Sequence, residues 1–306
     1  MQKVIIDTDP GIDDAMAVLF ACLCPDIDLV GLTSIFGNVT TDIATRNAKV
    51  LAEMARADVP VARGADGPVQ QAARPVAWEI HGREGFGGVA PITPAGQPLD
   101  ETAAEFICRA VTEHPGEIVL CPVGPLTNLA RALDLDPSIA GKVKSVTVMG
   151  GSLDEGGNAT PHAEANVWQD PHAADMVFAA DWDVTLVGLD VTHQVKCTPE
   201  HFAHLAAQAP VLGGFLNEAV QHYFEFHRSV DRFDGCYMHD PAAVVSIVRP
   251  DLFQVERQPL RVIVDGEETG CTVRAVGSDR PPASICMQVE VDAVRSLFLD
   301  TVSSGF

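Results

Sequence analysis

The sequence predicts a single-domain α/β protein with a mostly parallel, Rossmann-like open sheet and helices on both faces. Short apolar runs of strand length alternate with segments of helical periodicity along the chain. Its 306 residues are 47% hydrophobic and show no linker, repeat or low-complexity tract, so we assign residues 1–306 to one domain. Ligands of open α/β sheets bind beyond the carboxyl ends of the strands, and we expect the active site there.

The first predicted strand ends in an unusual cluster of acids. The apolar residues 4–6 precede Asp7, Asp9, Asp13 and Asp14, which place four carboxylates within eight residues. The last two should lie in the first turn of the following helix, whose dipole tolerates negative charge. Four carboxylates this close repel one another unless a cation neutralises them or one stays protonated. The cluster therefore indicates a hard-metal site for Ca²⁺ or Mg²⁺.

The spacing of the acids fits neither an EF-hand nor a simple helix cap. An EF-hand loop counted from Asp7 would place Ile12 where glycine is needed and Val18 where a bidentate glutamate is needed. A strand also precedes the loop, where an EF-hand has a helix. A set of helix-capping acids needs one or two carboxylates and not four.

The remaining elements follow in alternation. Aromatic residues gather in the segment 223–238, where helical spacing favours a core role, although such rings could also stack on a ligand. We expect strands at 28–35, 59–64, 118–121, 143–149 and 182–189, helices at 41–57, 103–112, 170–180, 199–207 and 215–228, and short strands at 260–264, 271–276 and 285–291 before a final helix.

Composition restricts the partners. The formal net charge of −22 argues against nucleic acid or an anionic membrane and favours a small neutral ligand. No apolar stretch is long enough to cross a bilayer, and the first residues lead directly into a strand without a signal-peptide pattern. Eight cysteines without a C-x-x-C pair are typical of reduced core thiols, so we expect a cytoplasmic protein.

Residues 7–14, Asp-Thr-Asp-Pro-Gly-Ile-Asp-Asp, resemble the D-x-D-P-G-x-D-D signature of the nucleoside hydrolases, the inosine-uridine-preferring N-ribohydrolase family. Further stretches resemble this family in the same order along the chain. They are His-Gly-Arg-Glu-Gly-Phe-Gly-Gly at 81–88, Gly-Pro-Leu-Thr-Asn at 124–128, Met-Gly-Gly at 149–151 with a later Gly-Asn and Glu-Ala-Asn ending at 166, and His-Asp-Pro at 239–241. Alone, the last stretch could be a simple helix cap at Asp240.

The resemblance implies a glycosidase of purine and pyrimidine salvage that hydrolyses the N-glycosidic bond of ribonucleosides to base and ribose with a Ca²⁺-activated water. It implies that Asp9 is the general base and that Ca²⁺ is held by Asp9, Asp14, Asp240 and the carbonyl of Val123. It also implies that His239 is the general acid toward the leaving base. Asp7 is expected to orient the turn.

The same resemblance implies the residues that bind the substrate. Ala165 departs from the family, in which many members carry Phe between the Glu and the Asn, and this change affects packing against the sugar. Relatives also imply a homo-oligomer, a dimer or a tetramer. The expected substrate-binding residues are Asp13, Asn38, His81, Met149, Asn158, Glu164 and Asn166.

Two alternatives are open at this point. A phosphatase of the haloacid dehalogenase type also begins with a strand and an Asp-x-Asp pair, but Gly11 stands where that class needs Thr or Val. A catalytically silent nucleoside- or Ca²⁺-binding protein would not need the complete set of acids that this chain retains. The preferred base is also open, because its contacts lie in variable loops and in the segment 223–238.

Overall fold

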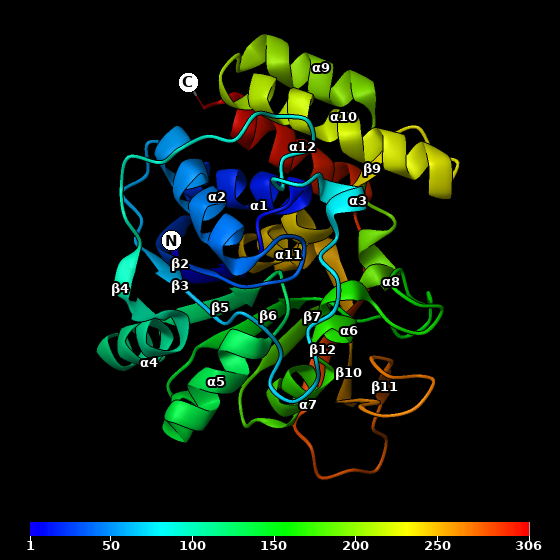
Figure 1. The fold of residues 1–306 in the computed structure, drawn as a ribbon. Helices are drawn as coiled ribbons and strands as arrows, with labels where there is room; N and C mark the ends of the chain where they lie inside the picture. The colour runs from blue at the N-terminus through cyan, green and yellow to red at the C-terminus, as the bar shows by residue number, and fades with distance from the viewer. Residues whose placement is uncertain (306) are drawn as a thin grey trace.

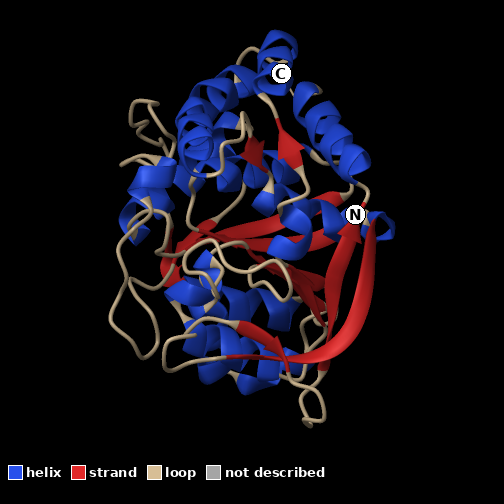
Figure 2. Ribbon diagram, turned by 90° about the vertical axis from the view of Figure 1, so that its right-hand side faces the viewer, coloured by secondary structure: helices blue, strands red, loops and turns tan. Residues whose placement is uncertain are grey.

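A large sheet runs through the molecule, and helices cover both of its faces (Figures 1 and 2). The computed structural model describes residues 1–305, and within that range ten strands form this sheet in the order β11-β10-β12-β7-β6-β5-β1-β2-β3-β4. All neighbours are parallel except β10, which runs antiparallel to β11 and β12. The strands are β1 Gln2–Thr8, β2 Ile27–Ser34, β3 Val61–Arg63, β4 Leu99–Thr102, β5 Ile118–Pro122, β6 Ser145–Met149, β7 Val184–Val187, β10 Phe253–Val262, β11 Thr272–Arg274 and β12 Pro282–Val289.

Strand β1 is the point at which the order of the sheet reverses. It pairs with β2 on one side and β5 on the other, and the chain then builds outward in both directions. In open α/β sheets the crevice at such a switch point receives the ligand. The acids that follow β1 therefore lie where this topology predicts a site.

The helices form two layers around separate apolar cores. One layer contains α1, α2, α11 and α12 with α9 and α10 stacked beyond them, and the opposite layer contains α4, α5 and α7 (Figure 1). No helix within residues 1–305 is long and apolar enough to span a membrane. The helices are α1 Ile12–Leu23, α2 Thr41–Met54, α3 Trp78–His81, α4 Ala103–Glu113, α5 Thr127–Leu135, α6 Ala165–Gln169, α7 Pro171–Ala179, α8 Leu189–Thr192, α9 Pro199–Gln208, α10 Leu212–Val230, α11 His239–Val248 and α12 Val291–Ser303.

The predicted fold class is confirmed, whereas several element boundaries differ. The strand expected at 260–264 is the end of the longer β10, in which residues 254–259 are mostly polar and none is buried, so they lack an apolar signal. The strand expected up to residue 189 ends at Val187, because Gly188 caps the short helix α8. The elements not predicted are β4, α3, α5, α6, α8, the two-stranded ribbon of β8 Lys196–Cys197 and β9 Cys236–Tyr237, and the 3₁₀ turns Pro137–Gly141 and Pro250–Leu252.

Helix α1 begins where the acids are, as predicted. Its N-cap is Gly11, and the carboxylate of Asp14 accepts hydrogen bonds from the backbone N–H of Gly11 at 2.9 Å and of Asp9 at 3.2 Å. Thr8 Oγ1 donates to the same carboxylate at 2.5 Å. These contacts fix the turn between β1 and α1. By accepting from backbone N–H groups at the start of α1, Asp14 therefore acts in part as a helix-capping acid.

Asp7 and Asn128 hold the strand ends beneath the turn. Asp7 Oδ1 accepts from Thr33 Oγ1 at 2.6 Å and from Asn128 Nδ2 at 2.7 Å, and burial raises the pKa of Asp7 to about 7. Asn128 Nδ2 also donates to the Ser34 carbonyl at 3.0 Å, and its Oδ1 accepts from the Ala65 N–H at 3.0 Å. One side chain of α5 therefore joins β1, β2 and the loop after β3.

Replacing Asn128 with alanine should destabilise the protein. Asn128→Ala leaves several buried polar groups without partners, and we expect a loss of about 2–3 kcal/mol in the free energy of unfolding, measured by urea denaturation. Asn217→Ala on α10 is the control, because its side chain makes no hydrogen bond within residues 1–305, and it should change stability by less than about 0.5 kcal/mol. Equal effects of the two substitutions would contradict the role of Asn128.

Candidate active site

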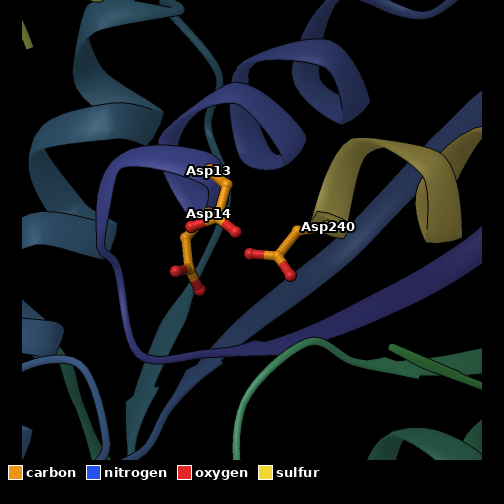
Figure 3. A group of neighbouring side chains, drawn as sticks. All are labelled: Asp13, Asp14 and Asp240. Carbon is orange, nitrogen blue, oxygen red and sulfur yellow. The ribbon is translucent and has the colours of Figure 1, made fainter. Parts of the chain in front are cut away.

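Three carboxylates from two distant segments meet above the end of β1. Asp13 and Asp14 lie in the first turn of α1, and Asp240 lies in the first turn of α11. The Asp13 and Asp240 carboxylates extend toward each other with Asp14 beside them, and one oxygen of each lies within 4.8 Å of the others (Figure 3). All three are buried. Asp240 is not an N-cap, because Met238 occupies that position, so a capping role does not explain it.

Burial and mutual repulsion strongly affect these acids. Burial, followed by the charge of Asp14, raises the pKa of Asp13 to about 8. Burial and the neighbouring acids also raise the pKa of Asp9 and of Asp240 well above the usual range. Asp9 Oδ1 and Asp13 Oδ1 are buried and have no hydrogen-bond partner among the described residues. Such atoms fit the oxygen-ligand chemistry of a hard divalent cation, which would let the acids ionise together.

Asp9 is held in a narrow slot beside the three acids. Its Oδ2 accepts from the backbone N–H of Asn38 at 2.6 Å, and Asn38 Nδ2 donates to Asp14 at 2.9 Å. A Cβ atom on Gly37 would lie 2.1 Å from Asp9 Oδ2, and one on Gly124 would lie 2.6 Å from Asp9 Oδ1. Real Cβ atoms do not approach so closely, so both glycines are required by the position of this carboxylate.

A cavity of about 490 Å³ lies over the acids. Trp168 and Gln169 on α6 also line it, although no sequence motif marks them. Ala165, the departure from the family, lines the cavity as well, and its N–H donates to Asn158 Oδ1 at 2.9 Å. Ten of the twelve residues proposed for the site line this cavity, namely Asp13, Asn38, His81, Val123, Met149, Asn158, Glu164, Asn166, His239 and Asp240, whereas Asp9 and Asp14 do not.

Asn166 joins two strand ends on the floor of the cavity. Its Nδ2 donates to the carbonyl of Val123 at 2.9 Å and to that of Met149 at 3.2 Å. Glu164 is the N-cap of α6 and accepts from the N–H groups of Gly151, Asn166 and Val167. In this structure Val123 and Glu164 therefore already have protein partners.

Two histidines line the other side of the cavity. His81 Nδ1 accepts from the Ile12 N–H at 3.1 Å, so its hydrogen lies on Nε2, and burial lowers its pKa to about 3. His81 ends the short helix α3 and is buried. His239 Nδ1 is 2.8 Å from Thr192 Oγ1, and burial followed by neighbouring histidines lowers its pKa well below the usual value.

Sequence patterns do not indicate every residue around His239. His193 lies with its ring centroid 5.5 Å from that of His239 and 4.7 Å from that of Tyr237. Its Nδ1 lies 3.3 Å from Glu155 Oε1. Thr192 ends the four-residue helix α8 and His193 is its C-cap, and no motif marks this segment, so only the folded chain places them here.

The sheet, the acids and the cavity define an α/β enzyme with a buried carboxylate site at the switch point of its sheet. The model of the inosine-uridine preferring nucleoside hydrolase family matches residues 4–296. The chain is 40% identical over 304 residues to uridine nucleosidase 1 of Arabidopsis thaliana, covering 96% of this chain and 90% of that protein. It is 37% identical to the inosine-uridine preferring nucleoside hydrolase of Crithidia fasciculata, covering 98% and 97%.

A solved structure agrees with these relatives. The plant nucleoside hydrolase PpNRh1 superposes with a TM-score of 0.95 at 37% identity, with 99% of each chain covered. The chain therefore belongs to the inosine-uridine preferring nucleoside hydrolase family. It is a hydrolase of N-glycosyl bonds in ribonucleosides, and the phosphatase alternative is not supported.

Replacing Gly124 with alanine should displace Asp9. Gly124→Ala brings a methyl group against Asp9 Oδ1, and a misplacement of about 1 Å within an active site can cost on the order of 100-fold in rate. We expect that loss in kcat for ribose release from whichever ribonucleoside the wild-type enzyme hydrolyses fastest, and circular dichroism should show that the fold is retained. Gly141→Ala, where nothing lies within 4 Å of the new methyl group, is the control and should keep full activity. A fully active Gly124→Ala variant would mean that the position of Asp9 is unimportant.

Proposed function

We propose that this nucleoside hydrolase binds Ca²⁺ at the acid cluster and hydrolyses ribonucleosides with Asp9 as the general base. The observation that carries the proposal is the group of Asp13, Asp14 and Asp240 beside Asp9, with two buried carboxylate oxygens that have no partner among the described residues. An arrangement of this kind is costly without a cation and is the usual way to hold a hard one. The specific cation follows from the family resemblance.

The proposed ligands are Asp9, Asp14, Asp240 and the carbonyl of Val123. Asp13 belongs to the same cluster and, like Asp240, lines the cavity, but only Asp13 has a buried oxygen without a partner among the described residues. We therefore assign Asp13 to a ribose hydroxyl, which its unpartnered oxygen can accept. When Val123 binds the cation, its carbonyl must share or lose the hydrogen bond from Asn166.

The chain supplies a base on one side of the sugar. When bound, Ca²⁺ lowers the pKa of a water and offsets the charge of the surrounding acids. Asp9 then takes a proton from the attacking water, since its Oδ1 is free while its Oδ2 is fixed by the Asn38 N–H. The slot between Gly37 and Gly124 keeps the carboxylate in that orientation.

We assign His239 to the opposite side of the bond, as the acid that protonates the leaving base. Its low pKa means that the ring is neutral, and Thr192 fixes one of its two nitrogens. In the tautomer in which Thr192 donates to Nδ1, the hydrogen lies on Nε2 and is available to the base.

The sugar is proposed to lie between the acids and the loop after β6. Asn38, His81 and Met149 complete its surroundings in the cavity. Asn158, Glu164 and Asn166 offer the mixture of donors and acceptors that ribose hydroxyls require, with Glu164 and Asn166 toward the 5′ and 3′ positions.

We also propose a cytoplasmic location and a homo-oligomeric state, either a dimer or a tetramer. All eight cysteines are free, which supports a reducing compartment. Relatives of the family supply the expectation of an oligomer, which sedimentation equilibrium would measure.

Chelation should abolish ribose release. Purified protein should release free ribose from at least one common ribonucleoside in phosphate-free buffer, because water is the acceptor. Treatment with EDTA should remove the activity, and excess Ca²⁺ should restore it, since the carboxylates need the cation to ionise together. Activity that survives exhaustive chelation would reject the cation, and a strict requirement for phosphate would reject hydrolysis.

Replacing His239 should affect substrates according to their leaving group. His239→Ala should slow inosine hydrolysis by about 10²–10⁴-fold, because the departing base needs a proton. 4-Nitrophenyl riboside, whose leaving group needs none, should change far less. Thr301→Ala on α12 is the matched control in a buried position away from the cavity. Equal losses for both substrates would count against His239 as the acid.

A further inference from the structure

The wall of the cavity that α6 forms is open beside the proposed sugar site. Ala165 and Gln169 lie four residues apart on this helix, so they share one face, and both line the cavity. Glu164 and Asn166 on either side of Ala165 are buried, whereas Ala165 is only half-buried. Its side chain is a single methyl group, at a position where many members of the family carry Phe. Space is therefore left between the two residues that we assign to the sugar.

Gln169 brings to this space a polar group that the proposed mechanism does not use. The residue is 6% exposed, and its Nε2 donates to the Pro75 carbonyl at 3.4 Å. A carbonyl can only accept, so the amide nitrogen faces Pro75 and the amide oxygen is left over. This Oε1 is buried and has no hydrogen-bond partner among the described residues. A buried acceptor without a partner is costly and points to a ligand that donates a hydrogen bond.

The backbone around Gln169 is fixed, while its amide group is free to turn. Arg74 lies over the Trp168 ring, 3.9 Å from the ring centroid, and its Nε donates to the Trp168 carbonyl at 2.8 Å. Gln71 Nε2 donates to the Gln169 carbonyl at 2.8 Å. The contact from the Gln169 amide to Pro75 is long for a hydrogen bond, so the amide can turn toward a donor in the cavity at little cost.

The charge of the cavity restricts what this space can bind. No lysine or arginine is among the described residues that line it, and Arg74 lies against Trp168 outside the lining. The acidic lining residues are Asp13, Glu164, Asp231 and Asp240. Because Glu164 directly precedes Ala165, a phosphate or carboxylate beside Ala165 would be repelled. A neutral group with a hydrogen-bond donor fits both the charge and the free oxygen of Gln169.

We propose that the space beyond Ala165 is a subsite for ribonucleosides that carry a small neutral substituent with a hydrogen-bond donor on C5′, and that Gln169 accepts this donor. The inference rests on the proposed function, which places the 5′ end of the ribose beside Glu164. The reaction itself is unchanged. Water still cleaves the N-glycosidic bond, and the products are the free base and a 5-substituted ribose.

The test compares substrates that differ only at C5′. The Ca²⁺-loaded enzyme is assayed for kcat/KM with three derivatives of the ribonucleoside that it hydrolyses fastest: the 5′-deoxy compound, the 5′-deoxy-5′-propylthio compound and the 5′-deoxy-5′-(2-hydroxyethylthio) compound. All three lack the 5′-hydroxyl, and the two thioethers have the same length. We expect the hydroxyethylthio compound to exceed the propylthio compound by about 10-fold and to exceed the 5′-deoxy compound as well.

A fourth substrate tests the charge of the subsite. The 5′-monophosphate of the same nucleoside should be hydrolysed at least about 100-fold less efficiently than the hydroxyethylthio compound, because like charges placed together cost several kcal/mol. A monophosphate hydrolysed as efficiently as the hydroxyethylthio compound would contradict a neutral subsite.

One variant assigns the preference for the donor to Gln169. Gln169→Leu keeps the size of the side chain and removes the amide, so the two thioethers should be hydrolysed with kcat/KM values within about 2-fold of each other. Gln208→Leu is the matched control, because Gln208 is the last residue of α9 as Gln169 is of α6, but it is exposed. This control should keep the wild-type ratio of the two thioethers.

A second variant tests the space itself and decides the matter if Gln169→Leu does not fold. Ala165→Phe fills the subsite with a ring, so the ratio of the hydroxyethylthio compound to the 5′-deoxy compound should fall by at least about 10-fold. Ala203→Phe, the same change at an exposed position of α9, should keep the wild-type ratio.

Failure of the inference can be told from failure of the proposed function. If the parent nucleoside is hydrolysed but both thioethers are hydrolysed less efficiently than the 5′-deoxy compound, the subsite does not exist. Equal rates for the two thioethers in the wild type, or a ratio unchanged in Gln169→Leu, would remove Gln169 as the acceptor. In each of these cases the proposed function stands. No base release from any nucleoside would overturn the proposed function and the inference together.

Discussion

The repulsion among buried carboxylates is the constraint on which the site depends. Asp9, Asp13, Asp14 and Asp240 are all removed from water, and charges within the group raise the pKa of its members. Hydrogen bonds from neutral groups can offset only part of the free-energy cost of burying these charges. Thr8, Asn38 and backbone N–H groups already donate such bonds to Asp14 and Asp9. The oxygens left without partners among the described residues explain why the site needs a cation and why its acids stay available for chemistry.

Buried polar contacts at the end of β1 hold the segment that carries the acid cluster in place. Asp7 does not join the acid cluster but accepts from Thr33 and Asn128, and so fixes the end of β1 relative to its neighbours. Gly37 and Gly124 contribute by having no side chain, because a Cβ atom at either position would overlap the Asp9 carboxylate. Precise placement of the Asp9 carboxylate, the proposed general base, therefore comes from both hydrogen bonds and close packing.

Much of this could be predicted from the sequence because the signals are local. The alternation of apolar runs and helical segments is sufficient for the fold class, and the acids of residues 7–14 mark the end of the first strand. Residues 254–259 of β10 are mostly polar and none is buried, and α8 has only four residues, so neither carries a periodic signal and sequence patterns miss them. Sequence patterns also fail to identify His193 and Thr192, because these residues join the site only through contact with His239, which is distant in sequence.

The meeting of α1 with α11 also bears on how the chain folds. The acid cluster needs Asp240, which lies near the end of the chain, against Asp13 and Asp14 near its beginning. Contacts between such distant segments carry a large entropic cost of loop closure and form slowly. During synthesis, most of the sheet can be assembled before α11 leaves the ribosome, so the acid cluster is among the last parts to form. A cation that binds there stabilises only the completed fold.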